Sequence, residues 1–418
     1  MKQNVLIISL ILLTFFVISF LTNMIGPLVP DIIDSFDLSL TLVALLPFAF
    51  FIAYGLMSIP SGMLIERFGE KKVILAAFGC AFTGAFLFAS GPSYGMYIVS
   101  LFFIGAGMAM LQVAINPLLR VAGGESNFAF NSVIGQLFFG LASFLSPLMY
   151  TYLVLNIGKD VEGKNAIVRV LEGMVPANLP WISLYWVFAL VALLMIGIVA
   201  VVRFPKVEKK EGDKTGAIAL HLELLKNPTV IKYFLAIFAY VGTEQGIANW
   251  ISKFLETYHG VDPQTTGAST ISWYWGLMTA GALFGLALLK ILDSRKVLIL
   301  FTGAAMVCLA ISLFGPTHVI LTTFPLIGFF ASVMWSVIIS LGLNSLESHH
   351  GSVSGILVTG IAGGAIVPLI VGSLGDAFGL RMGMLFLFVT MGYIFSVGFW
   401  ARPLVTNKTI KWGIDNWR

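Results

Sequence analysis

A succession of long apolar segments constrains the fold of this chain more than any other feature. Of its 418 residues, 58% are hydrophobic and only 11% are charged. A soluble protein of this length cannot bury so much apolar surface, because its exterior must carry more polar cover. A membrane-spanning helix needs about 20 apolar residues. Twelve segments meet that requirement, and they run over residues 5–26, 40–65, 73–90, 94–118, 128–155, 181–203, 229–257, 265–290, 296–315, 317–345, 352–374 and 382–402.

The distribution of positive charge predicts the orientation of these segments. With both termini placed in the cytoplasm, nineteen of the 24 Lys and Arg residues fall on the inner side and five on the outer side. Cytoplasmic loops carry such an excess in membrane proteins. We therefore expect a multi-pass protein of the inner (plasma) membrane with both termini cytoplasmic. The basic, aromatic tail over residues 408–418 is expected to rest on the inner leaflet of the bilayer.

The most polar stretch of the chain divides it into two parts. We predict an N-terminal six-helix bundle over residues 1–203, a cytoplasmic linker over 204–227, and a C-terminal six-helix bundle with the basic tail over 228–418. The two parts resemble each other, since segment four ends with Asn116-Pro117 and segment ten with Leu343-Asn344. The predicted fold class is an all-α membrane protein of twelve transmembrane helices in two six-helix bundles. Parallel repeats of this kind are typical of transporters with a site at the midplane.

One apolar segment contains an unusual polar stretch, from Tyr240 to Trp250. It carries the carboxylate of Glu244 and the amides of Gln245 and Asn249. An ionisable side chain inside a membrane is costly, and by default it marks a functional site. On a helix, Tyr240 and Glu244 share one face. Such a face is expected to line a wet cavity or a seam between helices.

The loop after the second segment contains a spaced set of glycines and charges. Its residues are Gly62, Glu66, Arg67, Gly69, Lys71 and Lys72. The spacing resembles the loop signature of the major facilitator superfamily, with Glu66 in place of an aspartate. A glycine in this position lets two helices approach closely, and the acid can pair with an arginine or cap a helix. A weaker form recurs from Gly285 through Asp293, Arg295 and Lys296; the plain alternative is an ordinary positive inner loop.

Three further stretches are similar to the fucose/glucose/galactose–cation symporter family within that superfamily. They are Leu111–Pro117, Tyr240–Trp250 and Ser340–Pro368. The resemblance implies a major facilitator fold and sugar transport. A proton-coupled member of that family has an acid on helix one and another on helix four, whereas this chain has Gly26 and Gln112 there. Glu244 is then the best remaining membrane carboxylate, and resemblance to the sodium-driven branch favours Na⁺ over H⁺ as its cation.

Sugar sites require amides and carboxylates for the hydroxyl groups and an aromatic platform for the C–H faces. The predicted substrate-binding residues are Asn23, Gln112, Gln136, Gln245, Asn249, Trp273 and Trp335. Each amide could instead connect two helices, and Trp273 could be an interfacial belt residue. Asp31, Asp34 and Asp37 are expected to be solvated in the first outer loop.

The predicted function is import of a neutral hexose by cation symport, with alternating access around the midplane site. The alternative is a drug or lipid exporter of the same fold, acting as a proton or sodium antiporter, and a third possibility is a membrane sensor. No catalytic motif and no phosphate-binding loop are visible. We therefore expect no enzyme activity, no cofactor and no nucleic-acid partner. The expected partners are the sugar, the coupling cation and the lipid bilayer, with a monomer as the working unit.

Overall fold

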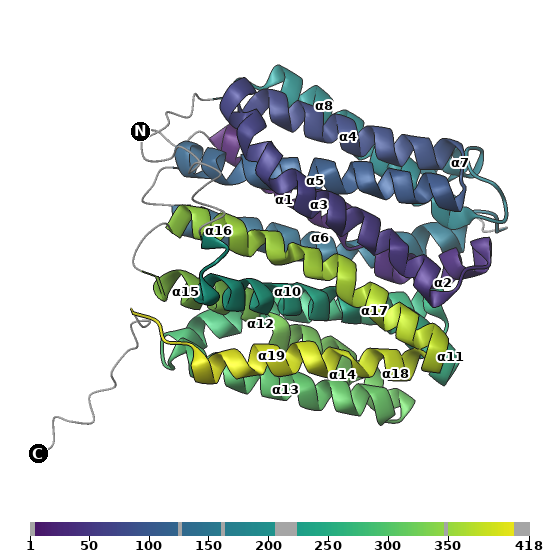
Figure 1. Ribbon diagram of the computed structural model, residues 1–418. Coiled ribbons are helices and arrows are strands. Elements are labelled where there is room, and N and C mark those ends of the chain that lie inside the picture. Colours follow the sequence, from purple (N-terminus) through teal and green to yellow (C-terminus); the bar gives the residue numbers. More distant parts are fainter. Residues whose placement is uncertain (1–4, 124–127, 160–163, 205–223, 347–349, 405–418) are drawn as a thin grey trace, which may run out of the picture.

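The computed structural model describes all residues except 1–4, 124–127, 160–163, 205–223, 347–349 and 405–418, and the described chain is entirely helical. Most of the predicted linker over 204–227 and the tail over 408–418 lie outside the described residues. We call residues 5–204 the N-terminal half and residues 224–404 the C-terminal half. Figure 1 shows the helices of the two halves lying side by side in two groups.

The N-terminal half contains these elements in chain order: α1 (Val5–Thr22), α2 (Ile25–Phe36), α3 (Leu40–Phe68), α4 (Glu70–Ser90), α5 (Tyr94–Gly123), α6 (Phe128–Asn156), α7 (Ala166–Glu172), the 3₁₀ turn η2 (Pro180–Ile182) and α8 (Ser183–Val201). The C-terminal half contains α10 (Pro228–Ala248), α11 (Ile251–His259), the π turn η4 (Pro263–Gly267), α12 (Ala268–Leu289), α13 (Ser294–Phe314), α14 (Thr317–Ala331), α15 (Met334–Asn344), α16 (His350–Thr359), the 3₁₀ turn η5 (Gly360–Ala362), α17 (Gly363–Phe378), α18 (Leu380–Leu385) and α19 (Leu387–Trp400).

The two ends of the bundle are named here by their elements. The end that carries α7, α11 and η4, and the turn between α2 and α3, is called the α7 face (right side of Figure 1). The other end, with the α3–α4 turn, is called the opposite face. At the opposite face Gly69 ends α3 and begins α4 with a φ of 81°, a backbone conformation that favours glycine.

Eleven helical stretches of the described chain are long and apolar enough to cross a membrane. The sequence predicted twelve, and the helix missing from the eleven is α10. This helix contains Lys232, Glu244 and Gln245 among its 21 residues. Yet α10 packs inside the bundle against α17, α19, α15 and α16. Helix α10 is therefore missing from the eleven because its sequence is less apolar, although it packs within the same bundle as the others.

The first span is longer than the sequence predicted. We expected it to end at residue 26, but after a break at Asn23-Met24 the chain continues as α2 to Phe36. Pro27 is tolerated because it falls in the first turn of α2, where a backbone N–H has no partner within the helix. Asp31 and Asp34 therefore lie on a helix, not in a loop.

Two helix breaks stand at corresponding places in the two halves. The break between α1 and α2 has the sequence Asn23-Met24-Ile25, and the break between α10 and α11 has Asn249-Trp250-Ile251. The two breaks meet in space: a Cβ atom added to Gly26 would lie 2.4 Å from the carbonyl oxygen of Ala248. The backbone at Asn249 is thus brought against the first turn of α2, which follows Asn23.

Candidate functional site

The Glu244 carboxylate is held by neutral hydrogen-bond donors. Tyr240, one turn earlier on α10, donates its hydroxyl to Oε2. Gln245 donates from Nε2 to Oε1 at 3.2 Å. None of the ion pairs between described residues includes Glu244. This carboxylate is half-buried, and its hydrogen-bond partners among the described residues are neutral.

Aromatic side chains from two other helices flank this carboxylate. Tyr274 of α12 donates its hydroxyl to the backbone oxygen of Glu244 at 3.3 Å. The ring of Trp335, on α15, lies 6.1 Å from the ring of Tyr240, centroid to centroid. Trp335 is half-buried and follows the break between α14 and α15. We call Tyr240, Glu244, Gln245, Tyr274 and Trp335 the Glu244 cluster. Tyr274 was missed from the sequence, where its apolar surroundings look like ordinary core.

Three buried N–H donors close in sequence to members of this cluster have no hydrogen-bond partner among the described residues. They are Nδ2 of Asn249 and the indole Nε1 atoms of Trp250 and Trp275. Asn249 is 5% exposed, and it lies one helical turn beyond Gln245. Buried donors without acceptors are rare because each one costs free energy. These donors suit a ligand that offers acceptor oxygens, as a sugar does.

Asn23 lies in a different environment from Asn249. Its Nδ2 donates to Oγ of Ser143 at 2.8 Å and to Oγ of Ser19 at 3.3 Å. Ser19 in turn donates to the backbone oxygen of Phe139 at 2.6 Å. Ser19 belongs to α1 and Asn23 directly follows that helix, whereas Ser143 and Phe139 belong to α6. The amide N–H groups of Asn23 therefore connect two helices, and its predicted contact with substrate stays a prediction.

The other predicted sugar residues are more scattered. Gln112 is half-buried on α5, and Gln136 is exposed on α6. Trp273 is 55% exposed, and its ring packs edge-on against Phe144 at a centroid distance of 5.4 Å. An indole so exposed at the side of the bundle fits the interfacial belt better than a sugar platform. Their roles as ligands stay predictions.

The loop motif of the N-terminal half makes few contacts. A Cβ atom on Gly62 would meet nothing within 4 Å, so the expected close approach of two helices at this glycine is wrong for this structure. The side chain of Glu66 lies outside the described residues. Arg67 stacks over Phe68 with its guanidinium carbon 5.2 Å from the ring centroid.

Lys71 and Lys72 of this motif differ in their surroundings. The Nζ atom of Lys71 donates to the backbone oxygens of Ala200 and Val202, both at 2.8 Å. A positive charge is favourable there, because these carbonyls end α8. Lys72 is exposed. Within this part of the motif, Lys71 is the residue that ties the turn to a neighbouring helix.

The related turn of the C-terminal half is more tightly bound. Asp293 accepts hydrogen bonds at Oδ1 from the backbone nitrogen of Arg295 at 2.8 Å and from its Nε at 3.1 Å. Partial burial opposes ionisation of Asp293, but the hydrogen bonds and charge of Arg295 outweigh it and lower its pKa. A Cβ atom on Gly285 would stand 2.0 Å from Cγ1 of Val333. The close helix contact expected at the N-terminal motif is thus found in this half.

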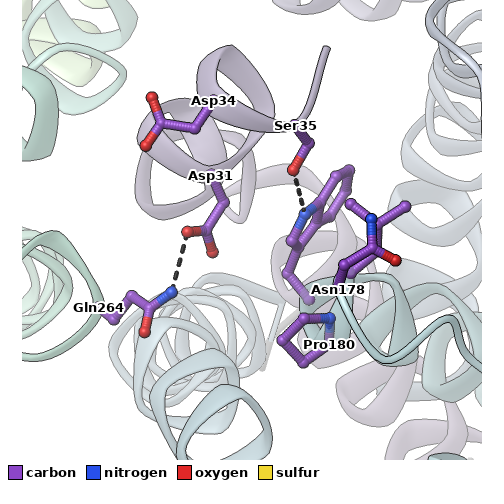
Figure 2. A pocket seen from close by; sticks show the side chains of 8 residues that line it. Asp31, Asp34, Ser35, Asn178, Pro180 and Gln264 are labelled. Carbon is purple, nitrogen blue, oxygen red and sulfur yellow. Dashed lines mark hydrogen bonds between the residues drawn. The ribbon is translucent and has the colours of Figure 1, made fainter. Parts of the chain in front are cut away.

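A pocket of about 310 Å³ opens at the α7 face. Its lining includes Asp31, Asp34 and Asn178 from the N-terminal half and Gln264 from the C-terminal half. Figure 2 shows the side chain of Gln264 reaching Asp31, while the carboxylate of Asp34 points elsewhere. Asp31 was expected to be solvated, yet it is half-buried and hydrogen-bonded. No cluster of three or more His, Cys, Asp or Glu side chains forms within the part of the chain that the structure describes.

Comparison with known proteins finds similarity along nearly the whole chain. A sequence profile of the Major Facilitator Superfamily matches residues 11–368. The glucose/galactose transporter of Brucella abortus is 31% identical over 397 residues, which cover 91% of this chain and 90% of that protein. The L-fucose-proton symporter of Escherichia coli is 26% identical over 399 residues, with 90% and 89% covered.

Solved structures show the same likeness in the backbone. The crystal structure of a variant of the Escherichia coli fucose:proton symporter aligns with a TM-score of 0.66 at 24% identity. The alignment covers 94% of this chain and 97% of that one. At this level of identity the likeness concerns the fold.

Proposed function

The chain belongs to the major facilitator superfamily, and from this premise we propose that it is a secondary active transporter that imports a neutral hexose by cation symport. The proposal draws on the names of its relatives, a glucose/galactose transporter and an L-fucose-proton symporter. It draws equally on the polar residues around α10. Amides, a carboxylate and indoles are the groups that bind the hydroxyls and C–H faces of a sugar.

The proposed topology has twelve spans, with α10 and α11 together forming the seventh. Residues 1–203 and 228–418 then form two six-helix bundles that rock about the midplane, joined by a linker over 204–227. The excess of Lys and Arg assigns the opposite face to the cytoplasm and the α7 face to the outside of the inner membrane. Both termini would then be cytoplasmic.

Within the site, we assign the coupling cation to Glu244 and the sugar to neighbouring side chains. Carboxylate and hydroxyl oxygens from Glu244 and Tyr240 are hard ligands that suit Na⁺ and also suit a proton. Gln245, Asn249 and Trp335 are the predicted sugar residues that the geometry supports best, because they surround or adjoin the carboxylate. The lack of acids at residues 26 and 112 leaves Glu244 as the best membrane carboxylate, and the resemblance to the sodium-driven branch favours Na⁺ over H⁺.

Coupling follows from binding both ligands in one closed state. If the cation and the sugar each stabilise that state, each raises the affinity of the other by the same factor. Neither ligand alone then drives the conformational change efficiently. This account needs a carboxylate that exchanges its cation with solvent, and Glu244 is suited to that because its described partners are neutral.

The observation that carries the proposal is the Glu244 carboxylate inside a helix packed within the bundle, where its partners among the described residues are all neutral. Uptake of labelled hexoses into proteoliposomes tests it, with an inward Na⁺ gradient, an inward proton gradient, or neither. We expect accumulation of a hexose above its outside concentration with one gradient, Na⁺ being favoured. Equal uptake in all three conditions would contradict symport, and no uptake of any hexose would contradict the substrate class.

A further inference from the structure

The two halves are joined at the α7 face by carboxylates that accept hydrogen bonds across the interface. Asp376 of α17 accepts from the backbone nitrogens of Leu40 and Thr41, at Oδ1 and Oδ2 respectively, both at 2.8 Å. Asp31 of α2 accepts at Oδ1 from Nε2 of Gln264 at 3.0 Å. Each of these contacts connects a residue of one half to a residue of the other. We call this set of contacts the outer latch.

Asp376 is poorly placed for its own helix and well placed for its neighbour. It lies in the last turn of α17, where the helix dipole disfavours a negative charge. It lies at the first two residues of α3, whose backbone N–H groups have no acceptors within the helix. The dipole of α17 acts on Asp376 in both states, whereas the hydrogen bonds from the start of α3 form only when α3 and α17 touch. The charge of Asp376 therefore favours the state in which the α7 face is closed.

Asp31 and Gln264 form the second part of the latch. Tyr150 of α6 donates its hydroxyl to Oδ2 of Asp31 at 2.6 Å, which fixes the carboxylate within the N-terminal half. The backbone oxygen of Gln264 accepts from Oγ1 of Thr151 at 2.7 Å. Gln264 is thus bound at its side chain and at its backbone by residues of the other half. Figure 2 shows this bond beside the pocket at the α7 face.

We propose that Asp376 and the Asp31–Gln264 pair are positioning residues that set the balance between closed and open states of the α7 face during transport. This inference rests on the alternating access of the proposed function, because the α7 face must open to admit sugar. Opening separates α3 from α17, and it separates η4 from α2 and α6, so all four of these cross-half hydrogen bonds must break. Weakening the latch raises the population of the state open at the α7 face.

A single-cysteine reporter tests this balance. Ala44 of α3 is 1% exposed, and a Cβ atom on Gly372 of α17 would stand 3.1 Å from its Cβ atom. The parent protein carries Ala44→Cys with Cys80→Ser and Cys308→Ser. A membrane-impermeant maleimide applied to the α7 face of intact cells should then label this thiol only when the two helices separate.

Asp376→Asn is expected to raise the labelling rate by about fivefold, the factor that corresponds to a helix-end charge effect of about 1 kcal/mol. Adding Gln264→Ala should raise it further, because the two contacts are separate. Asp34→Asn is the matched control: it removes an acid from the same region of α2, but its carboxylate makes no hydrogen bond across the halves among the described residues. Its labelling rate should equal that of the parent.

Asp376→Glu is the rescue variant. Because it keeps a carboxylate at this position, its labelling rate should stay closer to that of the parent than the rate of Asp376→Asn. An unchanged rate in Asp376→Asn and in the double variant, in protein that elutes as the parent does, would overturn the latch. If Asp376→Asn does not fold, Gln264→Ala alone decides by the same measurement. Hexose uptake by the parent is measured in parallel. Its absence contradicts the proposed function, whereas the ratio of labelling rates between variant and parent tests the outer latch separately.

Discussion

The two asparagines at the corresponding helix breaks differ in what they bind. In the N-terminal half the amide of Asn23 donates to two serine hydroxyls and helps hold α1 against α6. In the C-terminal half the amide nitrogen of Asn249 has no partner among the described residues, although it is equally buried. One asparagine is engaged by serines of its own half, and the amide nitrogen of the other has no partner among the described residues, as the proposed role in sugar binding requires. The sequence treats the two residues alike, so only their surroundings separate the roles.

The two halves also differ in how continuous their long helices are. Apart from the break at Asn23, the long helices of the N-terminal half are continuous, as in α3 and α5. In the C-terminal half breaks separate α10 from α11, α14 from α15, and α16 from α17. Discontinuous helices are typical of the part of a transporter that binds and moves. We infer that the N-terminal half is the more rigid support and that the C-terminal half carries the adjustable site.

The largest effect is expected from Glu244→Gln. This change removes the carboxylate proposed to bind the coupling cation in the C-terminal half, and residues 26 and 112 of the N-terminal half are not acids that could replace it. The amide keeps the size of the side chain, but it has no negative charge to attract Na⁺ and cannot take up a proton. Cation-driven accumulation should be lost, whereas exchange of labelled for unlabelled sugar across the membrane should survive. Proteoliposome uptake and counterflow measure the two activities.

Glu172→Gln is the control for that variant. Glu172 lies at the α7 face, and hydrogen bonds from Lys164 and from the backbone nitrogen of Gly158 lower its pKa. Removing this charge should leave accumulation unchanged. If Glu244→Gln still concentrates sugar, the C-terminal half does not hold the coupling ion, and the contrast between the halves loses its main support.

Asn249→Ala should weaken sugar binding while sparing the fold. Loss of one hydrogen bond to a ligand costs about 1 to 1.5 kcal/mol, which corresponds to an increase in KM of about tenfold. The melting temperature should stay close to that of the parent, because the Asn249 amide nitrogen has no hydrogen bond to lose among the described residues. Uptake kinetics and thermal unfolding measure the two quantities. A lower melting temperature with an unchanged KM would place Asn249 in the same structural class as Asn23.

Asn23→Ala should have the reverse effect. Its removal leaves the hydroxyls of Ser19 and Ser143 with one partner fewer in a buried site, at a cost of about 1 to 3 kcal/mol. The melting temperature should fall, and KM should change less than in Asn249→Ala. Thermal unfolding with and without sugar separates the outcomes. A tenfold rise in KM without loss of stability would restore the prediction that Asn23 binds substrate.

The sequence predicted an all-helical protein with many membrane-spanning segments, because apolar length is a property of single segments. It also singled out Glu244, since a carboxylate in an apolar helix is conspicuous without any structure. It could not separate Asn23 from Asn249, because hydrogen-bond partners such as Ser143 lie 120 residues away along the chain. It missed Asp31 and Asp376 for the same reason. Their partners belong to other helices, and an acid near the end of a span looks like a solvated one.

The smallest effect in this comparison concerns the motif glycines of the two halves. Gly62→Ala should leave stability unchanged or raise it by up to about 1 kcal/mol, because alanine favours a helix and meets no neighbour. Gly285→Ala should lower stability by about 1 to 3 kcal/mol, since its Cβ atom would overlap Val333. Thermal unfolding of the two variants measures the difference.

Transport by Gly62→Ala then gives the more informative result. If uptake equals that of the parent, Gly62 has no steric role in any state of the cycle. If uptake falls while the melting temperature holds, α3 must approach another helix at Gly62 in a conformation other than this one. Such an approach would occur at the opposite face when the α7 face opens. The glycine of the N-terminal half would then serve the second state of the transporter, as Gly285 serves the present one.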